Sequence, residues 1–95
     1  EFFNYPNPFS NLIHEKTKIR YVLLKEQTLG IFYIIDLGGD MVQVMELENT
    51  FLTTGSHEIQ WNGRNMNGNL VSSGVYLGIL KMDDSNKKIK IVIRN

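Results

Sequence analysis

The 95-residue chain contains no cysteine, and this excludes disulfide bonds, thiolate catalysis and the common cysteine-ligated zinc sites. It also carries no surplus of either charge, because ten Lys and Arg balance ten Asp and Glu. Nucleic acids are bound through a basic surplus, so we expect no nucleic-acid partner. No apolar run reaches the roughly 18 residues that a membrane-spanning helix needs, and we therefore expect no transmembrane span.

What the chain does contain is ordinary globular composition, with 42% hydrophobic and 21% charged residues. This length and composition predict one small domain over residues 1–95 with a single modest core. The chain starts at Glu1 without Met or a basic and apolar leader. We therefore expect it to be processed or to be a piece of a larger protein.

Side chains alternate between apolar and polar along most of the chain, and no stretch has the spacing of an amphipathic helix. Turn-forming residues separate the alternating stretches, for example Gly38-Gly39-Asp40 and Asp83-Asp84-Ser85-Asn86. About seven short strands result, which is the pattern of an all-β antiparallel sandwich, with a barrel as the main alternative. The clearest strands are expected at residues 17–24, 29–37, 41–47, 75–82 and 87–94, with a loop at 49–55.

Trp61 is the only tryptophan and lies on an alternating stretch, so it is expected to anchor the core. His57 has the same inward parity, which predicts a hydrogen-bonded histidine near the edge of the sandwich. The two histidines, His14 and His57, have no metal-ligand spacing, and the turn at Asn65–Asn69 offers amides where calcium prefers carboxylates. We therefore expect no metal and no cofactor.

No combination of residues indicates catalysis. Ser72-Ser73-Gly74 lacks the strand-to-helix context of a nucleophile elbow, and Asp83 and Asp84 are adjacent residues in a turn. The chain is predicted not to be an enzyme.

The stretch at 29–37 is apolar on both parities, although a two-layer sandwich buries only one face of a strand. Ile31, Tyr33 and Ile35 share one parity and form a possible docking face. One interpretation is that the N-terminal Phe-rich segment or a loop covers this face. The other is that the face docks a neighbouring domain or a second copy of the chain.

Several strings occur in a particular order along the whole chain. Asn4-Tyr5-Pro6-Asn7-Pro8-Phe9 comes first, followed by Thr17-Lys18-Ile19-Arg20-Tyr21-Val22-Leu23. Gly55 to Asn65 comes next, with His57, Trp61 and Gly63. Gly68, Ser73-Gly74-Val75-Tyr76 and Lys90-Ile91-Val92-Ile93-Arg94 follow. In this order they resemble the immunoglobulin-like domain named after the flagellar hook-capping protein, which overlaps in sequence with the C-terminal sorting domains of type IX (Por) secretion.

The resemblance implies an immunoglobulin- or fibronectin-III-like sandwich at the C-terminus of a larger exported bacterial protein. It implies a non-catalytic accessory role in type IX sorting and cell-surface attachment, with secretion through the periplasm. The implied partners are the outer-membrane export machinery and a neighbouring domain of the same protein, and the oligomeric state is left open. The family-motif residues are Asn4, Tyr5, Pro6, Asn7, Pro8, Phe9, Gly55, His57, Trp61, Gly63, Gly68, Gly74, Tyr76 and Lys90.

Most of these positions have structural roles. Pro6 and Pro8 are expected to form a stiff entry that prevents edge pairing and lets Phe9 pack. Two positions depart from the family pattern: Asn62 stands where Asp is usual, and Gly30 replaces an apolar residue, which predicts a bulge or a close approach.

Three alternatives remain open at this point. The domain could be a structural spacer or a stabiliser docked on a catalytic domain. It could bind carbohydrate, although only Tyr5, Tyr33 and the N-terminal Phe residues are candidates for an exposed aromatic platform. It could also be part of a flagellar hook cap.

Overall fold

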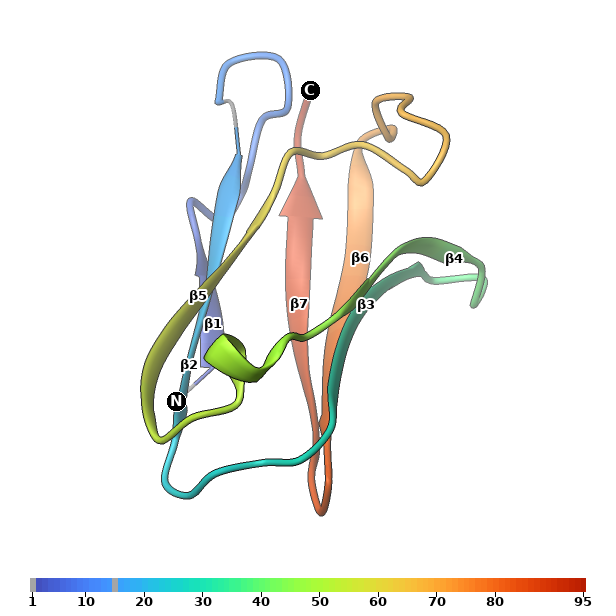
Figure 1. Ribbon diagram of the computed structural model, residues 1–95. Coiled ribbons are helices and arrows are strands. Elements are labelled where there is room, and N and C mark those ends of the chain that lie inside the picture. Colours follow the sequence, from blue (N-terminus) through green and yellow to red (C-terminus); the bar gives the residue numbers. More distant parts are fainter. Residues whose placement is uncertain (1, 15) are drawn as a thin grey trace.

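The computed structural model describes residues 2–14 and 16–95, which form two antiparallel sheets packed face to face (Figure 1). The described residues include seven strands, and the predicted β-sandwich is confirmed. One sheet has the order β1-β2-β5 and the other has the order β4-β3-β6-β7. The strands are β1 (Phe2–Tyr5), β2 (Thr17–Leu23), β3 (Gly30–Asp36), β4 (Met41–Glu46), β5 (Gly55–Trp61), β6 (Gly74–Met82) and β7 (Asn86–Ile93).

Strict alternation explains the strands of the three-stranded sheet. In β2, Thr17, Ile19 and Tyr21 are buried while the residues between them are exposed. The expected loop at 49–55 is wrong in part, because residues Asn49–Phe51 form a 3-10 turn and Gly55 already begins β5. Within the described ranges, no helix is long and apolar enough to cross a membrane.

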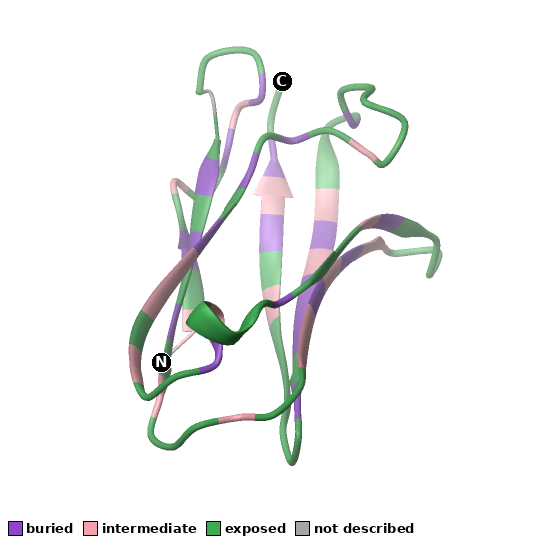
Figure 2. Ribbon diagram, in the orientation of Figure 1, coloured by how far each residue is buried: buried purple, intermediate pink, exposed green. Residues whose placement is uncertain are grey.

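One hydrophobic core fills the space between the sheets (Figure 2). Phe9, Ile19, Ile34 and Ile91 are each 0% exposed, so both sheets and the N-terminal segment contribute to it. Fully burying an aliphatic or aromatic side chain of this size stabilises the fold by roughly 1.5–3 kcal/mol.

Strand β3 lies inside the four-stranded sheet, between β4 and β6. The interpretation that the N-terminal Phe-rich segment covers its outer side is wrong, because β1 belongs to the other sheet. The close approach predicted at Gly30 is confirmed, since a Cβ there would lie 2.7 Å from Leu52 Cδ2. The bulge is elsewhere: the pairing of β3 with β4 shifts between Ile34 and Ile35.

Candidate functional site

The N-terminal motif lies along the last strand of the domain. Asn7 bonds the backbone of β7 at two points: its Nδ2 donates to Lys90 O at 3.2 Å, and its Oδ1 accepts from Val92 N at 3.0 Å. Phe9 continues this pairing, with Phe9 N donating to Val92 O at 2.8 Å and Arg94 N donating to Phe9 O at 3.0 Å. The first and last strings of the motif therefore form one unit.

This unit covers the outer edge of β7, which would otherwise present unpaired backbone groups. Pro6, Asn7 and Pro8 themselves lie outside the strand ladders, and pairing begins directly after Pro8, where Phe9 forms a parallel bridge with Ile93. Proline lacks only its own N–H, so the side chain of Asn7 can supply the donor and acceptor between the two prolines. The expected packing of Phe9 is confirmed by its complete burial.

Trp61 joins this unit to the core. The indole is 4% exposed, and its Nε1–H donates to Arg64 O at 2.9 Å. Its ring centroid lies 6.3 Å from that of Phe9 and 6.1 Å from that of Tyr76, the latter edge-on. Tyr76 is itself held by a 2.7 Å hydrogen bond from its hydroxyl to Ser72 O. The predicted core role of Trp61 is confirmed.

Two buried asparagines fasten the connections around this cluster. Asn4 Nδ2 donates to Thr17 Oγ1 at 3.2 Å, and this hydroxyl donates to Pro6 O at 3.0 Å. Asn11 Nδ2 donates to Gly63 O at 3.2 Å and to Val71 O at 3.0 Å. The sequence pattern did not identify Asn11, because an asparagine that follows a serine is equally typical of an exposed turn.

The turn after Trp61 is organised by its own amides. Asn65 Oδ1 accepts hydrogen bonds from Asn67 N and Asn69 N, each at 3.0 Å. Arg64 Nη1 donates to Gly68 O at 2.8 Å across the same turn. In the turn at Asn65–Asn69, the Asn65 side chain therefore bonds the backbone and shapes the connection to β6.

Not all motif residues meet at this end of the sandwich. His57 lies towards the start of β5, where its ring stacks on Tyr21 at 5.3 Å and its Nε2 lies 2.6 Å from Thr53 O. The predicted hydrogen-bonded histidine is confirmed, and Gly55 opens the same strand. Tyr5 is 70% exposed and Lys90 is exposed, so their side chains are available for recognition.

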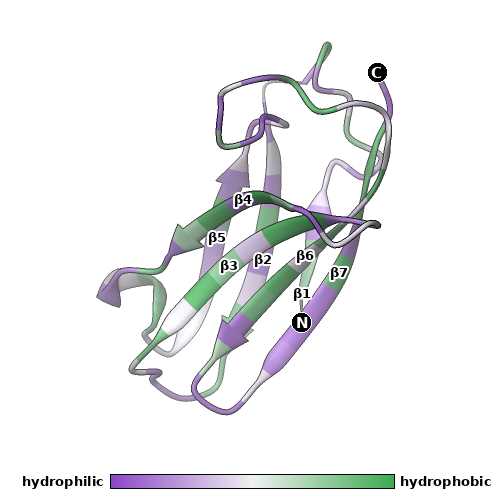
Figure 3. Cartoon of the chain, turned by 90° about the vertical axis from the view of Figure 1, so that its right-hand side faces the viewer, coloured by the Kyte–Doolittle hydropathy of each residue, from purple (hydrophilic) through white to green (hydrophobic). Residues whose placement is uncertain are grey.

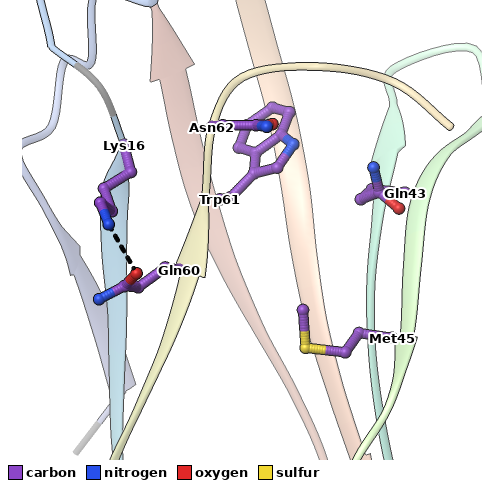
Figure 4. A pocket seen from close by; sticks show the side chains of 6 residues that line it. All are labelled: Lys16, Gln43, Met45, Gln60, Trp61 and Asn62. Atoms are coloured by element: carbon purple, nitrogen blue, oxygen red, sulfur yellow. Dashed lines mark hydrogen bonds between the residues drawn. The ribbon is translucent and has the colours of Figure 1, made fainter. Parts of the chain in front are cut away.

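The opposite side of the sandwich, between edge strands β4 and β5, forms an open groove of about 540 Å³ (Figure 4). Lys16 Nζ donates to Gln60 Oε1 at 3.0 Å on one wall, and Gln43 and Met45 line the other. The buried ring of Trp61 forms part of the lining, together with Asn62. Among the described residues, this lining has one cation and several amides but no carboxylate, so these residues offer no acid–base pair of carboxylates.

The structure places Ile31, Tyr33 and Ile35 together on the outer face of the four-stranded sheet, as their shared parity predicted. All three are half-buried. Tyr33 has apolar neighbours on this face, because it pairs with Val44 on one side and with Ile79 on the other. Ile31 instead lies between two charged residues, Glu46 and Lys81. Figure 3 looks towards this sheet and shows hydrophobic residues on β3, β4 and β6 and a hydrophilic start of β7.

Comparisons with known proteins find similar solved structures, whereas no family model and no curated protein matches the chain. Over 99% of its length the chain is similar to a part of PorZ, an essential surface component of the type IX secretion system of Porphyromonas gingivalis, with a TM-score of 0.69 and 26% identity. It is also similar to a part of dimeric latent PorU from the same bacterium, over 97% of its length with a TM-score of 0.69 and 18% identity.

A third similar structure is FlgD from Pseudomonas aeruginosa, matched over 81% of this chain and 58% of that chain with a TM-score of 0.62 and 19% identity. The matched parts are 11% of the PorZ chain and 9% of the PorU chain. The chain therefore has a domain fold that also occurs in type IX secretion proteins and in FlgD.

Proposed function

We propose that residues 1–95 are a non-catalytic domain that directs a larger bacterial protein through type IX secretion and attaches it at the cell surface. The observation that carries this proposal is the similarity to a part of PorZ, at 26% identity over 99% of this chain. The proposed partners are the outer-membrane export machinery and the rest of the parent protein.

The arrangement of the motif suggests how such a domain would be recognised. The Asn7–Phe9 segment holds the C-terminal strand in place through side-chain and backbone hydrogen bonds. The Lys90 side chain is exposed, while the backbone carbonyl of the same residue is bonded to Asn7. We infer that the export machinery contacts the folded end of β7, with Lys90 as a side chain that it reads.

The test is an export assay in a type IX-competent bacterium. A periplasmic reporter carrying residues 1–95 at its C-terminus is expected to reach the cell surface or the medium, and to stay in the periplasm in a strain without the type IX translocon. Periplasmic retention in both strains would contradict the proposal.

Two variants separate recognition from folding. Lys90→Glu reverses an exposed charge and leaves the carbonyl bonded to Asn7, so we expect reduced export with an unchanged melting temperature. The matched control is Lys18→Glu, which reverses an exposed charge on β2 in the other sheet and is expected to export normally. Equal export of both variants would show that Lys90 is not read.

A second candidate function is a structural domain docked on a neighbouring domain. It is favoured by the apolar outer face around Tyr33, which a solvated sheet does not require. In this case the reporter fusion would remain in the periplasm in every strain, and removal of the domain would destabilise the parent protein.

A further inference from the structure

The two sheets have outer faces of different character. The outer face of the three-stranded sheet is mixed, with Arg20 and Glu58 paired at 3.5 Å and Lys16 bonded to Gln60. Phe3, Tyr5 and Val22 are exposed beside these polar groups. The outer face of the four-stranded sheet is apolar across three strands. Ile79 lies on this outer face and does not belong to the hydrophobic core cluster between the sheets. It is nevertheless only 4% exposed, because its neighbours on the outer face pack around it. The apolar residues of this face include Tyr33, Ile35, Val44, Leu77, Ile79 and Val75.

Charges flank this apolar face unequally. The side formed by β6 and β7 is basic. Lys81 pairs in register with Ile31, Lys88 with Ile79 and Lys90 with Leu77, and all three lysines are exposed. The β4 side is acidic, with exposed Glu46 on the strand and exposed Asp40 directly before it. The ion pairs among residues 2–14 and 16–95 join Arg20 to Glu58 and Lys25 to Asp84, so none of them uses the charges of this face.

We propose that this outer face is the interface of a symmetric dimer, in which a second copy of the chain packs face to face about a two-fold axis along the strands. Such an axis places the basic β7 side of each copy over the acidic β4 side of the other, and the two contacts are identical. A two-fold axis across the strands would instead place lysine over lysine. The proposed arrangement brings Tyr33 over Ile79 of the second copy and Lys81 beside Glu46 of the second copy.

Shape favours a protein over a lipid surface as the occupant. Of the apolar residues named for this face, only Val44 is exposed, whereas insertion into a membrane needs a protruding apolar face with basic residues. Two sheets pack face to face at about 10 Å separation. Four strands of about seven residues cover an area of roughly 19 Å by 23 Å. This area is smaller than the about 800 Å² that each partner buries in a standard interface. The dimer is therefore expected to be weak and dependent on concentration.

The test is sedimentation equilibrium of the 95-residue chain from micromolar to millimolar concentration. We expect a monomer–dimer equilibrium that weakens at high salt, because the flanking contacts are between exposed charges. Tyr33→Lys places a charge at the centre of the face and should raise the dissociation constant at least about tenfold. Val22→Lys, an exposed apolar position on the outer face of β2, is the matched control and should leave it unchanged.

Charge reversal tests the direction of the axis. Glu46→Lys and Lys81→Glu should each weaken the dimer, and the chain that carries both changes should recover most of its affinity. Melting temperatures of all variants show that they fold. A chain that stays monomeric at every concentration overturns the proposal, whether or not it then binds phosphatidylglycerol vesicles. The proposal is also overturned if Tyr33→Lys dimerises with the same affinity as the Val22→Lys control. It is overturned as well if the chain with both charge reversals dimerises more weakly than either single variant. This proposal does not depend on type IX export, and the two sets of experiments fail independently.

Discussion

Asp83 accepts hydrogen bonds from Thr28, 55 positions earlier, at both carboxylate oxygens: the backbone N–H donates to Oδ2 at 2.8 Å and the hydroxyl to Oδ1 at 2.9 Å. Leu29 N donates to Oδ1 as well, at 2.9 Å. The turn between β6 and β7 is thereby joined to the connection that leads into β3. The hydrogen bond from the Thr28 backbone, followed by the one from Leu29, holds the pKa of Asp83 below its usual value.

Asp83→Asn is expected to lower the melting temperature at neutral pH, because the amide replaces one acceptor oxygen by a donor. A lowered pKa means that the stabilisation is present above the unfolded-state pKa, about 3.9, and is lost as the pH falls through the lower folded-state value. The difference between the wild type and the variant should therefore shrink in acid. Thermal melts between neutral pH and strongly acidic pH measure this difference in melting temperature.

Asp84→Asn is the matched control for this prediction. Asp84 is next in sequence and is paired only at 3.6 Å with Lys25, both side chains being largely exposed. Its substitution should change the melting temperature little at any pH. A pH dependence of Asp83→Asn identical to that of the wild type would contradict the assigned role of Asp83.

The environment of Tyr21 predicts that the stability of the domain also depends on pH in the alkaline range. Burial raises the pKa of Tyr21 to about 12, and its hydroxyl donates to Phe51 O at 2.8 Å. A raised pKa means that the stabilisation is complete below the unfolded-state value of about 10 and is lost as the pH rises towards the folded-state value. Tyr21→Phe should lower the free energy of unfolding by about 1 kcal/mol at neutral pH. It should also reduce the loss of stability as the pH rises between the two pKa values.

Alkaline melts followed by circular dichroism give the measurement for Tyr21. Tyr5→Phe is the control, since Tyr5 is 70% exposed and should have no effect on the curve. If Tyr21→Phe and the wild type lose stability equally over this pH range, a group other than Tyr21 causes the alkaline unfolding.

Trp61→Ala should destabilise the domain by about 3–5 kcal/mol, because it leaves a cavity beside Phe9 and Tyr76. Trp61→Phe keeps much of the volume but loses the hydrogen bond to Arg64 O, so its loss should be smaller. Urea unfolding has to be followed by circular dichroism, since Trp61 is the only tryptophan and its fluorescence disappears in both variants. Wild-type stability of the alanine variant would contradict the core role.

Gly63→Ala should destabilise the domain more than Gly68→Ala. Both glycines have positive φ, 75° and 85°, which costs an L-residue about 1–2 kcal/mol. At Gly63 the added Cβ would also lie 2.6 Å from Asn11 Cβ, whereas at Gly68 nothing lies within 4 Å. Comparing the free energies of unfolding of the two variants isolates the contribution of the contact, and equal values would show that Asn11 moves aside freely.

The strands were predictable because alternation is a local property. Residues 17–24 predicted β2, and 75–82 and 87–94 predicted β6 and β7 to within about one residue. Trp61 and His57 also took the positions that their parity indicated. Where a strand has a clear inner and outer face, the side-chain pattern alone determines which residues enter the core.

What alternation could not predict is which distant backbone groups pair. The bridge from Phe9 to Ile93 and the bonds from Asn7 to β7 join residues more than 80 positions apart, and no local pattern marks them. Asp83 and Asp84 are adjacent in one turn, yet only Asp83 bonds Thr28. On β3 both parities are apolar, so the sequence left open what covers the outer one.

The most direct test of the account is the fraction of a reporter carrying residues 1–95 that external protease can reach on intact type IX-competent cells. The account predicts that most of the exported reporter is accessible there, and that accessibility falls to background when the translocon is deleted. The same accessible fraction in both strains would contradict the proposed sorting function.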